Sequence, residues 1–184
     1  MKNIFVIFLL IMVFPLLNAR DRKLFNDDKC REAYLYHFLN RSCSCGDEIG
    51  VRILLSQGAD PNGKDYKNYA DCVGPFEFSS PLFVSVSVGN IEIAKMLLNV
   101  GANPNILEGE GVTPLVEAVE KENVELVQLL LKHGAKVDMK GLVYKPLEIA
   151  KKKGNIKMIK LLERNLKGKN GLPQEKRPKK HGRI

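Results

Sequence analysis

Apolar residues recur along this chain in short helical patches, and each patch is followed by a Gly-Ala pair. The patches cover residues 51–55, 93–98 and 126–131. The Gly-Ala pairs begin at Gly58, Gly101 and Gly134. The last two pairs are 33 residues apart and the first two are 43 apart, which is one period plus 10 inserted residues. Such a period is typical of repeat proteins, in which each unit buries its apolar face by stacking on the next.

A second recurring motif predicts where another helix of each unit begins. It reads Ser80-Pro81-Leu82 and Thr113-Pro114-Leu115 in the two clearest units. The Ser and Thr hydroxyls can cap a helix by accepting a backbone N–H, and proline suits the first helical position. Related motifs begin at His37 and Lys145, and a lysine cannot cap the helix in this way.

A turn position follows each of these motifs by nine residues and is occupied by Gly46, Gly89, Glu122 and Gly154. Each unit is therefore predicted to be a helix, a tight turn and a second helix. We expect this second helix to end with a positive φ angle at the glycine of the Gly-Ala pair.

With these motifs the chain resembles the ankyrin-repeat family, whose repeat contains Thr-Pro-Leu-His, a glycine turn, a Leu-Leu helix and Gly-Ala-Asp. The resemblance covers residues 34–165 and implies an all-α solenoid of about four helix-turn-helix repeats with short β-turn fingers. We expect an N-terminal extension over residues 20–33 and repeats over residues 34–166. The repeats span residues 34–62, 77–108, 109–141 and 142–166, and a long finger lies within 63–79.

Two departures from the family pattern affect the expected stability. The family's histidine, which ties neighbouring repeats together, is replaced by Asn40, Phe83, Val116 and Glu148. We therefore expect weaker polar coupling between repeats. Lys151 stands where a small buried residue is usual, which indicates that the fourth repeat is partly exposed.

The resemblance implies that the protein binds another protein through its fingers and its first-helix face. The long finger, GKDYKNYADCVGPFEFS, contains four aromatic residues, namely Tyr66, Tyr69, Phe76 and Phe78. Aromatic side chains on a projecting loop supply a large contact area at low entropic cost. Our hypothesis is that this finger is the main binding determinant. The alternative is that its aromatics fold back onto neighbouring helices.

The surface positions of the first helices differ in character from repeat to repeat. We expect a small, apolar patch with Val84 and Val88 in the second repeat and an acidic one with Glu117 and Glu120 in the third. These four residues are proposed to contact a partner. The fourth repeat should be basic there, with Ile149 also at the surface. The wider acidic zone comprises Glu108, Glu110, Glu117, Glu120, Glu122 and Glu125, and its alternative interpretation is ordinary solvated charge.

The N-terminus has the layout of a secretory signal peptide over residues 1–19. Lys2 precedes an uninterrupted apolar run over residues 4–17, and cleavage is expected after Ala19. This run of 14 residues is shorter than the roughly 20 that a membrane-spanning helix needs. We expect a secreted or periplasmic protein. The alternative is a protein that an uncleaved N-terminal segment anchors in the membrane.

Export would place the four cysteines of the chain in an oxidising compartment. Our hypothesis is that Cys72 forms a disulfide with Cys45 or Cys30 and pins the long finger, which could contribute about 2–4 kcal/mol. The alternative is four free thiols. Cys43 stands where the family has a buried alanine, and this indicates a small core residue.

The formal net charge of +8 is concentrated at the C-terminus. Residues 20–163 hold 20 Lys and Arg against 20 Asp and Glu, whereas residues 164–184 hold eight against one. Residues 167–184 lack apolar periodicity and are predicted to form a disordered tail. An alternative function is the binding of polyanions or of an anionic membrane surface by this tail. Its candidate residues are Lys176, Arg177, Lys179 and Lys180.

The sequence contains no motif that indicates catalysis. Gly-x-Ser-x-Gly, the phosphate-binding loop and His-Glu-x-x-His are all absent. Three histidines are a thin supply of ligands, and Cys43 and Cys45 are closer than zinc ligands usually are. We expect no enzymatic activity, cofactor, metal or small-molecule substrate. The expected molecule is a monomer that binds an as yet unidentified protein.

Overall fold

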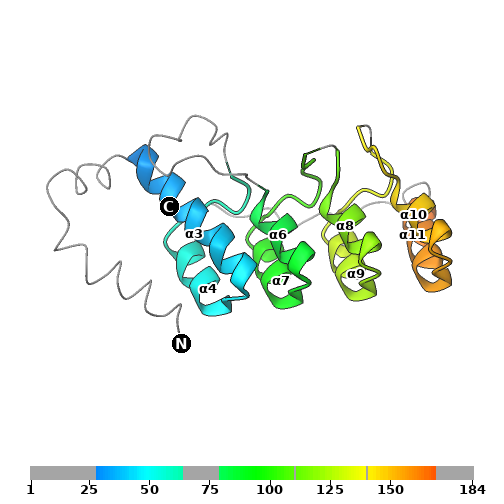
Figure 1. The fold of residues 1–184 in the computed structure, drawn as a ribbon, viewed down its shortest axis with the longest axis horizontal. Helices are drawn as coiled ribbons and strands as arrows, with labels where there is room; N and C mark the ends of the chain where they lie inside the picture. Colours follow the sequence, from blue (N-terminus) through cyan, green and yellow to red (C-terminus); the bar gives the residue numbers. More distant parts are fainter. Residues whose placement is uncertain (1–27, 64–78, 110, 140, 169–184) are drawn as a thin grey trace, which may run out of the picture.

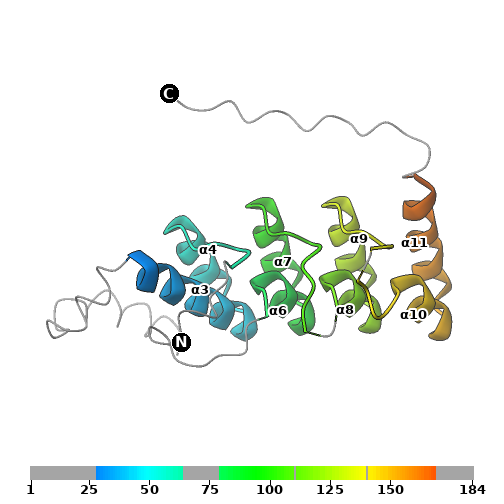
Figure 2. The same cartoon turned by 90° about the horizontal axis from the view of Figure 1, so that it is seen from above.

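The computed structural model describes residues 28–63, 79–109, 111–139 and 141–168, and these contain eight α-helices. The first helices of the repeats lie in one row and the second helices in another (Figures 1 and 2). Neighbours within each row contact one another, as do the two helices of each repeat. The architecture is therefore the predicted all-α repeat solenoid. The first helices are α3 (Asp28–Cys45), α6 (Pro81–Val88), α8 (Pro114–Glu120) and α10 (Pro146–Lys152), and the second helices are α4 (Glu48–Ser56), α7 (Ile91–Asn99), α9 (Val124–Lys132) and α11 (Ile156–Gly168).

The first helix is longer than its counterparts in the other repeats. It starts at Asp28, inside the segment that the sequence indicates as an N-terminal extension. Ala33 is only 2% exposed, so the packing of the first repeat begins before residue 34.

Side-chain caps fix where most of the helices begin. The side chains of Ser80 and Thr113 accept hydrogen bonds from the backbone N–H groups of Phe83 and Val116, and both are followed by proline. Lys145 makes no such bond. These observations confirm the expected capping pattern. The second helices are capped in the same way by Asp47, Asn90, Asn123 and Asn155.

The turn positions also have the expected backbone conformation. Gly46, Gly89 and Gly154 have φ angles of 71°, 83° and 68°. Glu122 takes the same position with φ 55°, and it is the one non-glycine residue with positive φ in the described ranges. The repeat pattern therefore imposes the turn even where glycine is missing.

The core lies between the two rows of helices and ends at the fourth repeat. Cys43, Val86 and Val119 occupy equivalent positions in the first three repeats and are each at most 1% exposed. Lys151 takes this position in the fourth repeat and is exposed, as the sequence predicts. A polar outer face is what a terminal repeat needs, because no further unit stacks on it.

Two asparagines link successive repeats along the finger edge of the stack. Asn62 Oδ1 accepts a hydrogen bond from the backbone N–H of Asn103 at 2.6 Å, and its Nδ2 donates to the carbonyl of Gly101 at 3.2 Å. Asn105 makes the same pair with the N–H of Lys136 at 2.8 Å and the carbonyl of Gly134 at 3.1 Å. We call this arrangement the asparagine ladder. It provides polar coupling between repeats in the absence of the family's histidine.

The ladder does not continue into the fourth repeat. Asp138 occupies the position of Asn62 and Asn105, and its carboxylate has no N–H group to donate. In the fourth repeat the second helix, α11, continues to Gly168. The second helices of the other repeats end before their Gly-Ala pairs. The third and fourth repeats are joined instead by a Glu120–Lys153 ion pair at 3.2 Å and by Asn155 Nδ2, which donates to Glu122 Oε1 at 3.0 Å.

Candidate protein-interaction surface

Tyr36 on α3 holds both ends of the long finger. Its hydroxyl donates a hydrogen bond to the carbonyl of Ser79 at 3.4 Å. At the other end, a Cβ atom on Gly63 would lie 2.6 Å from the Tyr36 ring, so only glycine fits there. Gly63 also has a φ angle of 64°, which favours glycine. Since Tyr36 is only 4% exposed, this buried ring forms a base at which the finger begins and ends.

The predicted binding residues of the long finger lie outside the described residues. These are Tyr66, Tyr69, Phe76 and Phe78, together with Cys72. Their role stays a prediction. The sequence did not single out Tyr36, because one tyrosine on a helix does not reveal that two distant chain segments meet on it.

The second finger, residues 103–113, carries a buried carboxylate that binds the start of α6. Glu108 and Val112 form an antiparallel β-bridge, which makes the finger a tight hairpin. Glu108 Oε1 accepts a hydrogen bond from the backbone N–H of Ser80 at 2.8 Å, and Glu108 is only 9% exposed. The prediction that Glu108 belongs to a solvated acidic zone is therefore wrong. Ser80 needs an acceptor at its buried N–H, and the Glu108 side chain supplies it.

The second finger contacts the third finger, residues 136–145, through two glycines. A Cβ on Gly111 would lie 2.7 Å from the carbonyl oxygen of Gly141 and 3.2 Å from Val143 Cγ2. A Cβ on Gly141 would lie 3.3 Å from Leu107 Cδ1. Close packing of the two backbones thus brings apolar side chains of both fingers to one place.

Leu107, Val143 and Tyr144 form an exposed apolar surface on these fingers, which we call the apolar finger surface. The three residues are 45%, 61% and 48% exposed. Large apolar side chains that cluster on a surface mark interaction sites more often than scattered ones do. Sequence reasoning missed this surface, although the apolar pair Val143-Tyr144 between Gly141 and the Pro146 helix start was a usable signal.

The first-helix face is less exposed than expected. Val88, in the last turn of α6, is 54% exposed, whereas Val84 is partly buried and packs against the core. Ile149 is only 9% exposed, so its expected place at the surface is wrong. Ile149 and Val84 occupy equivalent positions, and both pack into the core. The proposed contact of Val84 and Val88 with a partner stays a prediction.

The acidic side chains of the third repeat have partners nearby. Glu117 pairs with Lys121 at 3.6 Å and Glu120 pairs with Lys153 at 3.2 Å. Glu122 accepts the hydrogen bond from Asn155 described above. These contacts reduce the free negative charge of the patch. They favour a role in joining the third and fourth repeats, and a role of Glu117 and Glu120 in partner binding remains a prediction.

The described cysteines differ in their environments. Cys43 is fully buried, and desolvation raises the pKa of its thiol to about 12. Cys45, in the last turn of α3, is exposed and carries a free thiol. Cys45 and Cys30 lie on α3 about 13 Å and about 9 Å along the helix axis from Tyr36. Cys72 lies outside the described residues, so its proposed disulfide with Cys45 or Cys30 stays a prediction.

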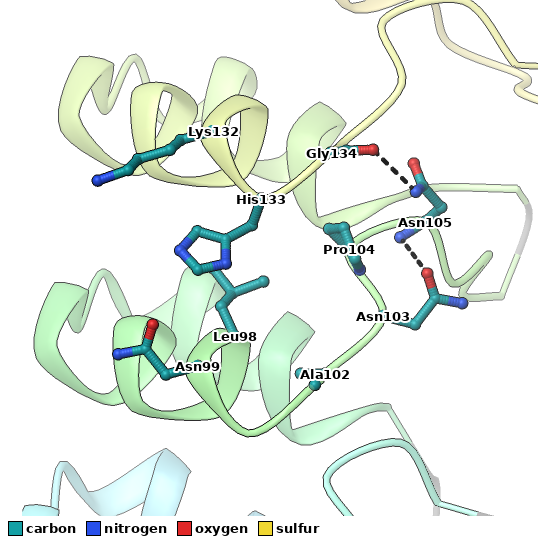
Figure 3. A pocket seen from close by; sticks show the side chains of 10 residues that line it. Leu98, Asn99, Ala102, Asn103, Pro104, Asn105, Lys132, His133 and Gly134 are labelled. Carbon is teal, nitrogen blue, oxygen red and sulfur yellow. Dashed lines mark hydrogen bonds between the residues drawn. The ribbon is translucent and has the colours of Figure 1, made fainter. Parts of the chain in front are cut away.

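A groove with a volume of about 510 Å³ lies between the ends of α7 and α9. In Figure 3 the His133 side chain points from the end of α9 toward Leu98 and Asn99 on α7. The amides of Asn103 and Asn105 also line the groove but are engaged in the finger hydrogen bonds. Lys132 is the last residue of α9, where positive charge complements the helix dipole, and His133 is the C-cap. The groove is thus explained by helix termination and repeat coupling.

The described residues were also compared with what a metal site and a membrane-spanning helix require. They contain no group of three His, Cys, Asp or Glu side chains arranged to bind a metal ion. Nor does any helix in the described ranges have the length and apolar character needed to cross a membrane. The tail residues Lys176, Arg177, Lys179 and Lys180 lie outside the described part, and their binding of polyanions stays a prediction.

Comparison with known proteins agrees with this architecture. Residues 82–171 match a family model described as ankyrin repeats, in three copies. The stacked helix pairs, turns and fingers within residues 82–168 are therefore ankyrin repeats. Repeats of this kind generally mediate protein–protein interaction and are generally not catalytic.

Several proteins are similar to this chain over the repeats. An ankyrin repeat protein of fowlpox virus is 31% identical over 68% of the chain, and an ankyrin repeat-containing protein of Treponema pallidum is 41% identical over 30%. The ADP-ribosylation factor GTPase-activating protein AGD2 of Arabidopsis thaliana is 34% identical over 50% of the chain. The matched regions cover only 11% to 19% of the lengths of these relatives. The similarity to the GTPase-activating protein is therefore confined to a small part of it.

Proposed function

We propose that this chain is an exported ankyrin-repeat protein that binds a protein partner on its finger side. The observation that carries this proposal is the apolar finger surface. Leu107, Val143 and Tyr144 lie on two fingers whose backbones approach closely at Gly111 and Gly141. A preorganised apolar surface binds with a smaller entropic cost than a loop that must first become ordered.

The long finger extends this surface in our proposal. Tyr36 fixes its two ends at the side of the stack where the asparagine ladder and the other fingers lie. Tyr66, Tyr69, Phe76 and Phe78 would then supply aromatic contacts beside the first-helix face with Val84 and Val88. A disulfide from Cys72 to Cys45 or Cys30 would limit the conformations of the finger before binding.

Partner capture with matched variants tests the binding surface. The protein is immobilised, proteins from the producing cell's surroundings are captured, and the captured protein is then titrated against each variant. Replacing Leu107, Val143 and Tyr144 by serine should weaken binding by at least about 100-fold, since central apolar contacts dominate interfaces. The control replaces Ile49, Val100 and Ile156, which are 63%, 53% and 63% exposed on or beside second helices. Equal loss in the two triple variants would overturn the proposed surface.

Deleting residues 64–74 tests the long finger separately. Our proposal expects binding to fall while the unfolding temperature falls no more than in Cys72→Ser, which removes only the proposed disulfide. If binding survives and stability is lost, the aromatic residues serve to cover neighbouring helices instead.

Export is supported by Lys2, by the apolar run over residues 4–17 and by the small residue Ala19 before the charged segment. N-terminal sequencing of protein isolated from the cells that make it tests this step. A chain that begins at Arg20, recovered outside the cytoplasm, is the expected result. Retention of Met1 in a membrane fraction would favour the alternative of an uncleaved anchor.

A further inference from the structure

The second helix of the fourth repeat differs in charge from the other second helices. Three equivalent outward positions are exposed in each of the last three repeats. They hold Glu92, Lys95 and Asn99 on α7, Glu125, Gln128 and Lys132 on α9, and Lys157, Lys160 and Arg164 on α11. Only the set on α11 is entirely cationic.

Lys167 extends this set, and we call Lys157, Lys160, Arg164 and Lys167 the basic face. All four are exposed, and their spacing of three, four and three residues places them along one side of the helix. The row is about 15 Å long, since a helix rises about 1.5 Å per residue.

No ion pair within the described part of the protein involves the basic face, although Glu163 lies beside it on α11, three residues from Lys160 and four from Lys167. On α7, Lys95 pairs with Glu92 at 3.7 Å. No acidic side chain of the described residues lies within ion-pair distance of Lys157, Lys160, Arg164 or Lys167. A concentrated set of like charges without partners raises the free energy of the isolated protein and is relieved by a negative surface.

The chemistry of the row favours a diffuse negative surface over a specific polyanion. Three of its four members are lysines, whose charge is compact and lacks the planar fork with which arginine recognises phosphates and bases. The row contains no aromatic side chain on which a nucleic-acid base could stack. Clusters of about 4–8 Lys and Arg are typical of proteins that bind anionic lipids.

The sequence that follows adds to the same charge. Residues 169–184 begin where the basic face ends and contain six more Lys and Arg against one Glu. The row on α11 therefore places the first cations of this run on a rigid helix.

We propose that the basic face of α11 docks the protein on an anionic lipid bilayer. This site is separate from the finger surface of the proposed function, so the two can fail independently. The helix lies flat on the membrane with its row of cations toward the lipid headgroups. Its apolar side remains packed in the repeat, where Met158 and Leu162 are buried.

Vesicle co-sedimentation with the full chain tests this proposal. Vesicles of phosphatidylcholine alone measure any binding by the apolar N-terminal run, which all variants share. Added phosphatidylserine should increase binding, and salt should reverse this increase. If phosphatidylserine adds nothing, the proposal is overturned.

Two double variants with the same change in net charge locate the interaction. Lys160→Glu with Arg164→Glu alters the basic face, and Lys95→Glu with Lys132→Glu alters the equivalent positions of α7 and α9. The first pair should lower the phosphatidylserine-dependent partition coefficient at least about tenfold. The control should change it less, because Lys95 and Lys132 lie on α7 and α9, outside the row on α11. Equal loss in both would show that only net charge matters, which would overturn a localised site.

Further variants and controls complete the test. Circular dichroism checks that both double variants keep the wild-type helix content, and Lys157→Gln with Lys167→Gln serves as a milder pair that should also weaken binding. A full-length variant with Lys176→Gln, Arg177→Gln, Lys179→Gln and Lys180→Gln should retain salt-sensitive binding through the basic face. Complete loss in that variant, or tighter binding to a DNA duplex than to the vesicles, would overturn the proposal.

Discussion

The carboxylate of Glu108 accepts a hydrogen bond from the backbone N–H of Ser80 at 2.8 Å, although the two residues are 28 positions apart. Ser80 is itself the N-cap of α6, so the bond connects the second finger to the start of the preceding repeat's first helix. Leu107 directly precedes Glu108. The same contact therefore fixes both the helix start and the finger that carries part of the apolar surface.

The unfolding free energy lost when Glu108 is replaced should depend on whether the Ser80 N–H keeps an acceptor. Glu108→Ala leaves this buried N–H unpaired, which costs about 1–3 kcal/mol of unfolding free energy. Glu108→Gln retains a carbonyl oxygen and should lose less. Urea denaturation measures both. Glu125→Ala, at an exposed position on α9, is the control and should change stability by about 0.5 kcal/mol or less. A Glu108→Ala variant as stable as this control would contradict the role assigned to the bond.

Alanine substitutions at Gly63 and Gly58 distinguish the cost of backbone strain from the cost of a steric clash. Both have positive φ angles, 64° and 91°, so alanine at either position costs roughly 1–2 kcal/mol. A Cβ on Gly58 meets nothing within 4 Å, whereas a Cβ on Gly63 would overlap the Tyr36 ring. Gly63→Ala should therefore lower the midpoint of thermal unfolding clearly more than Gly58→Ala. Equal decreases would mean that the Tyr36 ring moves aside without cost.

The stability of the first repeat should depend on pH through His37. Partial burial, with a smaller effect of the nearby Arg41 charge, lowers the pKa of His37 from 6.5. The unfolded chain then takes up a proton before the folded chain does, so acid favours unfolding. Between about pH 7.5 and about pH 5, wild type should lose more stability than His37→Gln. Urea titrations at each pH measure the difference, and a difference that stays constant with pH would rule out this contribution.

Cys43 and Cys45 should differ sharply in reactivity despite being two residues apart. At pH 8 a thiol with a pKa of about 12 is ionised at a level on the order of one in ten thousand, and the Cys43 side chain is fully buried. In reduced native protein, iodoacetamide should label Cys45 and leave Cys43 unmodified, as tandem mass spectrometry of the shared peptide can show. Denaturant should expose both. Equal native labelling would indicate that α3 opens readily.

Local sequence signals predicted most of the fold because the contacts that form it are local and repeated. Ser80 and Thr113 cap the helix that starts next to them, and Gly89 makes the turn at its own position. The long finger was recognisable as ten extra residues in a regular period. Such features depend on a few neighbouring residues, which the sequence shows directly.

Contacts between repeats were harder to predict because they depend on where side chains point after stacking. Glu108 looks like any charged finger residue until the N–H of Ser80 is found beside it. Ile149 seemed exposed by its position in one helix, but packing into the core buries it. The apolar finger surface arises only because Gly111 and Gly141 allow two fingers to touch.

The end of the asparagine ladder at Asp138 has a consequence for how the molecule opens. Neutral amides connect the first three repeats, whereas an exposed ion pair and a hydrogen bond to a charged carboxylate connect the fourth. Salt weakens the charged contacts to the fourth repeat and leaves the amide hydrogen bonds of the first three repeats nearly unchanged. In a linear array each unit is stabilised by its neighbours, so α10 and α11 can unfold as a separate segment. Amide hydrogens in these two helices should exchange faster with solvent as ionic strength rises, while those of the inner repeats keep their protection.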